Sequence, residues 1–156
     1  MDKIHFSSKN VVHATPQHLF DIINSKYNFN TDVCALPENT KCSHYFDPVM
    51  DGLKQDWNGV CWMNPPYARY VTDKWVKKAY ESSLNGAIVV CLLPARTDTK
   101  YFHDYCTKGV IYFIKGRLKF GGSTKSAPFP SVIVVFDSTR KPETYYTSVD
   151  GLKSVL

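Results

Sequence analysis

Residues 60–67 have the sequence VCWMNPPY, in which a short apolar stretch meets two consecutive prolines. Val60 to Met63 suit a buried strand. Prolines have a fixed φ and no backbone N–H, so they cannot continue a sheet ladder, and the strand is predicted to end at Met63, directly before Asn64. The chain therefore presents an asparagine and a tyrosine, Tyr67, directly after a strand.

Strand and helix patterns alternate on both sides of this segment. Seven apolar residues in a row at 87–93 are typical of a central strand buried on both faces. Further strands are predicted at 30–35, 110–114 and 131–136, with an edge strand at 145–148, and helices are predicted to begin at Thr15-Pro16, at Thr72 and at Thr97 or Asp98. This alternation predicts an α/β fold with a mainly parallel sheet, in which ligands bind at the carboxyl ends of the strands.

The composition is that of one folded domain. Hydrophobic residues make up 44% of the 156 residues, and no stretch reaches the roughly 18 apolar residues of a membrane helix. We expect a single domain over 1–156, with an N-terminal arm at 1–13 and a C-terminal extension at 138–156. The first residues lack the apolar core of a signal peptide, which predicts a cytoplasmic protein. Five cysteines are scattered without a CxxC pair, so we expect no metal site.

The four residues Asn64, Pro65, Pro66 and Tyr67 suit the methylation of an exocyclic amine. The lone pair of such an amine is delocalised into its ring, which makes the nitrogen a poor nucleophile. Two acceptors that bind both amine hydrogens push the nitrogen toward tetrahedral geometry, and the Asn64 side chain and the Pro65 carbonyl can provide them. Tyr67 offers a flat face on which an extruded base can stack. The alternative is an ordinary proline turn after a strand.

A second candidate region is the basic, glycine-rich segment 115–125. It contains Arg117 and Lys119, and Phe120 precedes two glycines that permit unusual backbone angles. Together with the net charge of +5, these cations make the segment the best candidate for contacting a phosphate backbone. We expect this loop to close on DNA and to hold a base against Tyr67. The alternatives are a solvated charge cluster and a core position for Phe120. Arg96 is a further candidate for a phosphate contact, and it could equally pair with a loop carboxylate.

Several motifs in this order resemble the small phage-type DNA N-6-adenine-methyltransferase (Dam) family. The resemblance extends from about residue 13 to residue 136, and it rests on A-T-P at 14–16, DVCA at 32–35, DGL at 51–53, DW at 56–57, NPPY at 64–67, LLPARTDT at 92–99 and GRLKFGG at 116–122. A set of motifs in one order is more specific than NPPY alone, which also marks glutamine-N5 methyltransferases. One departure is His13, where tryptophan is expected in the family.

The resemblance implies a DNA adenine-N6 methyltransferase with a Rossmann-like sheet, S-adenosylmethionine as the methyl donor and no metal. It also implies that the adenine lies between Tyr67 and Phe120. The residues that it places around the cofactor are Thr15, Pro16, Asp32, Val33, Cys34, Ala35, Asp51, Asp56 and Trp57. A loop-capping role for Asp32, solvated positions for Asp51 and Asp56, and a core position for Trp57 are the alternatives. The resemblance further implies a phage or prophage protein that acts in a bacterial host cell.

The spacing of the motifs predicts a reduced sheet. Asp32 and Asn64 lie about 32 residues apart. A full methyltransferase sheet has two further βα units in this interval, and a βαβ unit takes roughly 30 residues. The two units do not fit, so we expect about five main strands. The loop at 36–58 would then hold the adenosine end of the cofactor.

The patterns leave rival functions open. An enzyme that methylates adenine in RNA or a protein glutamine has the same motif, and a catalytically silent nucleic-acid-binding protein would keep the same fold. The positive charge and Phe120 favour a nucleic acid over a protein substrate, but they do not separate DNA from RNA. The intact NPPY motif argues against a silent protein. The sequence is compatible with a monomer or a homodimer and does not reveal a target DNA sequence.

Overall fold

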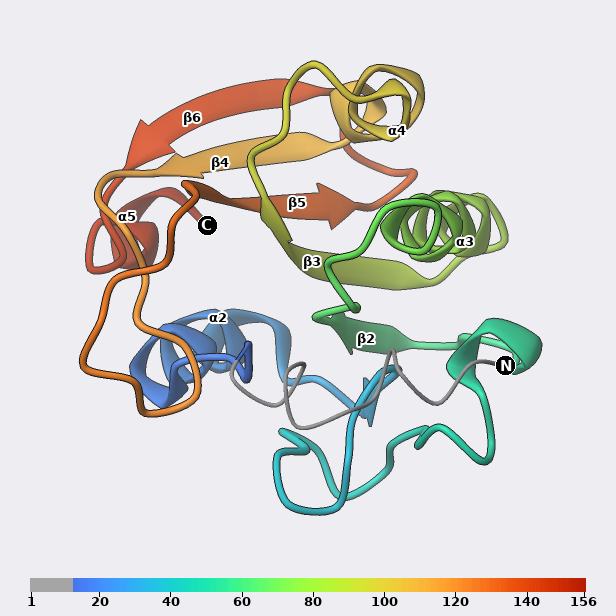
Figure 1. Ribbon diagram of the computed structural model, residues 1–156. Coiled ribbons are helices and arrows are strands. Elements are labelled where there is room, and N and C mark those ends of the chain that lie inside the picture. Colours follow the sequence, from blue (N-terminus) through green and yellow to red (C-terminus); the bar gives the residue numbers. More distant parts are fainter. Residues whose placement is uncertain (1–12) are drawn as a thin grey trace.

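A mixed six-stranded sheet organises the chain (Figure 1). The computed structural model describes residues 13–156, so the predicted N-terminal arm lies outside the described residues except for His13. The strand order is β1-β2-β3-β5-β4-β6. The strands are β1 (Thr31–Asp32), β2 (Val60–Met63), β3 (Ile88–Pro94), β4 (Val110–Ile114), β5 (Ser131–Phe136) and β6 (Glu143–Thr147).

One strand runs against the others. β1, β2 and β3 pair in parallel, and β6 pairs in parallel with β4, whereas β5 is antiparallel to both of its neighbours, β3 and β4. Every residue of β5 is buried, as expected for a strand in the middle of a sheet. The predicted α/β class is confirmed. The predicted number of about five strands becomes six, because the expected edge strand is a full member of the sheet and occupies 143–147 instead of 145–148.

Helices cover both faces of the sheet (Figure 1). One core lies under α2 and α5 and includes Leu19 and Ile23, and the other lies under α3 and α4 and includes Trp75 and Phe102. None of the described helices is both long enough and apolar enough to cross a membrane. The helices are α2 (Gln17–Tyr27), α3 (Thr72–Leu84), α4 (Lys100–Asp104) and α5 (Leu152–Val155), with short 3-10 turns η2 (Gly52–Lys54) and η3 (Cys106–Lys108).

The interval between β1 and β2 contains no further strand within residues 36–58, as the spacing predicts. It holds η2 and a single parallel bridge between Tyr45 and Asp32. The amide of Asp32 donates to the His44 carbonyl, and the amide of Phe46 donates to the Asp32 carbonyl. The loop therefore covers the outer edge of β1, which is shorter than the predicted strand at 30–35.

The helix starts differ from the predictions in a way that concerns the site. α2 begins at Gln17 with Pro16 at its N-cap and without a side-chain cap, so the predicted cap at Thr15 is wrong, and the Thr15 hydroxyl accepts a hydrogen bond from Asn64. α3 begins at Thr72 as predicted, but that hydroxyl donates to the Pro66 carbonyl (2.6 Å). Both threonines thus bind the NPPY segment. The third helix, α4, begins at Lys100, two residues later than the latest predicted start.

Candidate active site

The NPPY segment links β2 to α3 at the carboxyl end of a strand that lies between β1 and β3 (Figure 1). Pro65 and Pro66 are buried. The Thr72 hydroxyl donates to the Pro66 carbonyl and accepts from the Ala68 amide (3.0 Å). Because Pro66 and Ala68, on either side of Tyr67, both bind Thr72 of α3, this part of the turn is held in place at the carboxyl end of β2.

The carboxamide of Asn64 has a defined orientation. Its Nδ2 donates to the His13 carbonyl (2.7 Å) and to Thr15 Oγ1 (3.0 Å). A backbone carbonyl can only accept, so the contact with His13 assigns the nitrogen to that side. The Tyr67 hydroxyl donates to Asn64 Oδ1 (2.5 Å). The second lone pair of this oxygen remains available for a ligand donor.

Tyr67 is a neutral donor in this network. Burial raises the pKa of its hydroxyl well above the ordinary value, with smaller contributions from neighbouring groups such as Tyr101. The same hydroxyl lies 3.2 Å from the Leu92 carbonyl on β3. A phenol has one proton, so Asn64 and Leu92 are alternative acceptors, and a small rotation of the hydroxyl can release the Asn64 oxygen.

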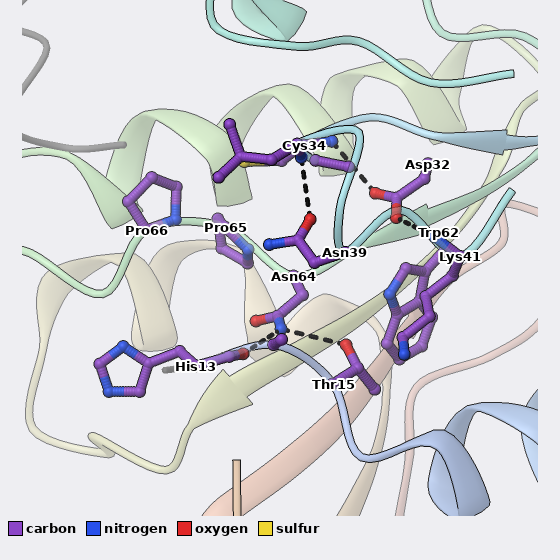
Figure 2. Close-up of a pocket in the computed structure, with 13 residues that line it drawn as sticks. His13, Thr15, Asp32, Cys34, Asn39, Lys41, Trp62, Asn64, Pro65 and Pro66 are labelled. Atoms are coloured by element: carbon purple, nitrogen blue, oxygen red, sulfur yellow. Dashed lines mark hydrogen bonds between the residues drawn. The ribbon is translucent and has the colours of Figure 1, made fainter. Parts of the chain in front are cut away.

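A cleft opens beside Asn64. It encloses about 540 Å³ of space between protein atoms, a volume that includes open solvent at its mouth. Its lining consists of 13 residues that come from the segments 13–15, 32–41 and 62–66. In Figure 2, Asp32 and Lys41 lie on one side of Asn64 and His13 lies on the other. The cleft therefore has a charged end, defined here by Asp32 and Lys41, and a second end at His13.

Asp32 carries the one carboxylate among the described residues that line the cleft, and only 3% of the residue is exposed. It accepts hydrogen bonds from the amides of Lys41 (3.0 Å) and Cys34 (3.3 Å). Burial raises its pKa to about 7, and these two hydrogen bonds and the Lys41 charge oppose the rise. The loop-capping role that is the alternative for Asp32 is thus present, and the same carboxylate also borders the cleft.

The charged end suits a ligand that carries charges of both signs. The Asp32 carboxylate complements a cationic group, and the Lys41 ammonium, which donates to Gln17 Oε1 (2.7 Å), complements an anionic one. The Trp62 indole N–H is buried at the cleft wall and has no hydrogen-bond partner among residues 13–156. A buried donor without a partner is a group that a bound ligand can satisfy.

Four rings form an aromatic cluster at the other end: His13, Tyr67, Phe120 and Phe129. The His13 ring centroid lies 5.1 Å from that of Tyr67, 5.6 Å from Phe120 and 5.9 Å from Phe129. Phe120 and Phe129 meet Tyr67 edge-on, at 6.1 Å and 5.7 Å. The Arg96 guanidinium lies 5.9 Å from the Phe129 ring centroid. Three predicted base or DNA contacts, Tyr67, Phe120 and Arg96, therefore meet in one place.

The expectation of an exposed Phe120 ring is wrong in this structure, and its core alternative is the correct one. The ring is 4% exposed and belongs to the core under α2. Side chains alternate along this segment, so that Leu118 and Phe120 point inward while Arg117 and Lys119 are exposed. The Gly121 amide donates to the Ala14 carbonyl (3.0 Å), which ties the loop to residues 13–15.

Several residues expected at the cofactor do not line the cleft. Trp57 is buried against Trp75, with its N–H donating to the Gly52 carbonyl (2.8 Å), so its core alternative is the correct one. Asp51 accepts from the Leu53 amide, and Asp56 is exposed. Val33 and Pro16 are also absent from the lining, whereas Thr15, Asp32, Cys34 and Ala35 belong to it.

Sequence reasoning missed other lining residues. Leu36, Asn39 and Lys41 border the cleft because the loop after β1 turns back on itself, with the Leu36 amide donating to Asn39 Oδ1 (2.8 Å). All three lie in the loop 36–58, which the sequence predicts to hold the adenosine end of the cofactor, but no feature of the sequence singles them out. Phe129 had no signal in the sequence, since it reaches Tyr67 only through the folding of the β4–β5 loop. Residues 13–156 contain no cluster of metal-ligating side chains.

The sequence is similar to phage enzymes. It is 34% identical over 136 residues to the DNA N-6-adenine-methyltransferase of Haemophilus phage HP1 (strain HP1c1), a match that covers 80% of this chain and 77% of the relative. It is 33% identical over 94 residues to the DNA N-6-adenine-methyltransferase of Escherichia phage T1, where 58% of this chain and 39% of the relative are covered. The family profile described as DNA N-6-adenine-methyltransferase (Dam) matches residues 6–154. The chain belongs to the DNA N-6-adenine-methyltransferase (Dam) family.

Proposed function

We propose that this chain transfers a methyl group from S-adenosylmethionine to the exocyclic N6 amine of an adenine in DNA. The observation that carries this proposal is the position of Asn64 between a charged cleft and an aromatic cluster, with its carbonyl oxygen oriented by Tyr67. The sheet supports the same conclusion. We interpret it as a reduced Rossmann-like methyltransferase sheet, because β1 and β2 pair directly and no βα unit lies between them. Residues 13–156 act as a single catalytic domain inside a bacterial host cell.

The charged end of the cleft holds the amino-acid part of the cofactor. S-adenosylmethionine supplies an electrophilic methyl group when it is bound. Its amino and carboxylate groups match the opposite charges of Asp32 and Lys41, and Thr15, Cys34 and Ala35 complete this wall. Asn39 and Leu36 extend the cleft along the 36–58 loop toward the place of the adenosine.

Asn64 and Pro65 accept the two hydrogens of the adenine amine. Asn64 Oδ1 keeps one lone pair beside its bond with Tyr67, and no described residue donates a hydrogen bond to the Pro65 carbonyl. Accepting both hydrogens turns the nitrogen lone pair toward the methyl group. The amine loses its proton after the attack, so the first step needs no side chain with a shifted pKa.

The aromatic cluster receives the base. An adenine that stacks on Tyr67 needs the space beside this ring that His13 fills, so the His13 ring moves aside when the base enters. Phe120 and Phe129 form a fixed wall that meets Tyr67 edge-on. Phe120 is thus a preformed side of the base site and does not act as a mobile clamp.

The exposed cations contact the DNA backbone. Arg117 and Lys119 project from the segment whose alternate residues build the aromatic cluster, which places positive charge beside the base site. Arg96, over the Phe129 ring, contributes a third cation. Such contacts neutralise phosphates and set the position of the DNA without reading its sequence.

Methyl transfer to nucleic acid tests this function. The protein is incubated with S-adenosylmethionine that carries a labelled methyl group and with DNA, RNA or protein in separate reactions, and the products are digested and analysed. We expect N6-methyladenine from DNA alone, and no product with an Asn64→Ala variant. Label in RNA adenine or in glutamine would replace the proposed substrate, and no label in any substrate would refute the enzyme reaction.

A further inference from the structure

The turn that follows the NPPY motif has an unusual residue, Tyr70, at its third position. The Val71 amide and the Thr72 amide both donate to the Ala68 carbonyl (3.1 Å each), which closes a turn over Ala68, Arg69, Tyr70 and Val71. Tyr70, the third residue, has φ 63°. A position with positive φ in such a turn is normally taken by glycine or asparagine. A bulky residue there strains the backbone.

Burial does not explain why a tyrosine occupies this position. Tyr70 is 71% exposed, so its ring gains little from the core. Its close partner is the exposed Arg69, whose guanidinium carbon lies 4.9 Å from the ring centroid. The turn therefore displays a flat aromatic face and a permanent positive charge together on the surface, at a cost in backbone strain.

This pair is fixed next to the site. Tyr70 follows Tyr67 by three residues, a separation that spans at most about 11 Å. The turn cannot swing freely, because Thr72 Oγ1 binds both the Ala68 amide (3.0 Å) and the Pro66 carbonyl (2.6 Å). The nucleotides next to a base at Asn64 are therefore within reach of Arg69 and Tyr70.

We propose that Arg69 and Tyr70 form a second DNA-contacting lip, in which Tyr70 stacks on a base beside the extruded adenine and Arg69 neutralises a phosphate. This inference rests on the proposed function. Extrusion of one base uncovers the faces of its neighbours, and an aromatic side chain can cover such a face regardless of sequence. Guanidinium next to an aromatic ring is the combination that single-stranded nucleic acid sites use. A protein partner would have no corresponding need for a cation beside the base site.

Replacement of Tyr70 by glycine separates this contact from a structural role. Glycine adopts a positive φ without strain, so Tyr70→Gly removes the ring and keeps or raises the melting temperature. We expect the variant to methylate matched duplex DNA at least about tenfold more slowly, through a higher KM for DNA. The loss is smaller for an adenine in a mismatch, which is easier to extrude. Tyr70→Phe keeps the face and is expected to stay within about twofold of the unmodified protein.

The charge of Arg69 is tested by salt. Arg69→Ala is expected to lower the slope of log Kd for duplex DNA against log salt concentration by about one unit, whereas Arg69→Lys keeps the slope. The lip is refuted if Tyr70→Gly and Arg69→Ala both bind and methylate DNA like the unmodified protein, which would leave the pair to a different partner. If the unmodified protein binds DNA but does not methylate it, and the variants lose affinity, the lip is supported while the proposed function fails.

Discussion

The charged end of the cleft and the aromatic cluster are built in different ways. Asp32, at the end of β1, and Lys41, in the loop that follows, come from ten consecutive residues, and backbone amides hold the carboxylate in place. The four rings of the cluster come from three segments that are far apart in the sequence, since Phe120 and Phe129 share the loop between β4 and β5, and they contact one another by ring packing. The first region is thus a local structure that the chain can form from neighbouring residues. The second exists only when the whole sheet is assembled.

Asn64 lies between the two regions. Its nitrogen is held by residues 13 and 15, and its oxygen is held by Tyr67 of the aromatic cluster. The short segment 13–15 also accepts a hydrogen bond from Gly121 through Ala14. Entry of a base and binding of a cofactor would therefore act on the same short piece of chain. Variants of the two regions can show how far they are independent.

The largest effect is expected where the regions meet. Asn64→Ala removes an acceptor that acts mainly in the transition state, so kcat should fall by about 100-fold or more. Binding of S-adenosylmethionine should stay nearly unchanged, since the oxygen of Asn64 faces the amine. Single-turnover methylation and calorimetry measure the two quantities. Thr15→Val, which removes one acceptor of the Asn64 nitrogen and keeps the Asn64 oxygen, is the matched control, and its kcat should fall less. Near-normal kcat in Asn64→Ala would end the catalytic assignment.

Phe120 tests whether the aromatic cluster is core. Because the ring is buried, Phe120→Ala should lower the free energy of unfolding by about 3 kcal/mol, roughly 100-fold in the folding equilibrium. Phe129 is only partly buried, so Phe129→Ala should cost less. Urea denaturation measures both. If Phe120→Ala leaves stability unchanged and still slows the methylation of duplex DNA, the ring is mobile and clamps the base after all.

Asp32 distinguishes the charged end by its response to pH. Its raised pKa means that the carboxylate is largely protonated below about pH 7 in the folded protein. A cation that binds beside it favours ionisation, so affinity for S-adenosylmethionine should rise by up to about tenfold per pH unit toward pH 7 and level off above it. Calorimetry with a chelator present checks this, and Asp32→Asn should flatten the profile. The exposed Asp56→Asn is the control, and a flat profile for the unmodified protein would exclude Asp32 from the site.

Stability provides a second readout for the same carboxylate. The folded protein binds this proton more tightly than the unfolded chain does, because burial raises the pKa from 3.8 to about 7. The contribution of Asp32 to stability therefore falls as the pH rises between these two values, and it stays low above pH 7. Denaturation of the cofactor-free protein at several pH values should show this fall, and Asp32→Asn should lack it.

The smallest effects are expected at the exposed cations beside the aromatic cluster. Arg117→Ala and Lys119→Ala should each weaken binding to all DNA sequences alike and lower the salt slope by up to about one unit. Lys141 is exposed and follows β5, which ends beside the amino end of β3, away from the carboxyl ends of β2 and β3. Lys141→Ala is therefore a control with no expected change. Anisotropy titrations at several salt concentrations measure the slopes. Unchanged slopes for both Arg117→Ala and Lys119→Ala would make these cations merely solvated charges.

The local patterns of the sequence determined much of this protein. Two prolines end β2 at Asn64, and strand β4 (Val110–Ile114) and strand β5 (Ser131–Phe136) have the predicted bounds. The short interval between Asp32 and Asn64 excludes further βα units there. These properties could be predicted because they depend on the fixed φ of proline, on runs of apolar residues and on chain length, which all act between neighbours along the chain.

Only the tertiary structure decided which distant residues share the site. No periodicity indicates that β5 lies reversed between β3 and β4, because strand order depends on how the helices pack on the sheet. That order brings Phe129 to Tyr67 and turns Phe120 inward, while Trp57 packs on Trp75 away from the cleft. An aromatic side chain gains from any buried apolar contact, so its sequence context does not specify which one it makes. Long-range packing assigned these rings either to the core or to the site.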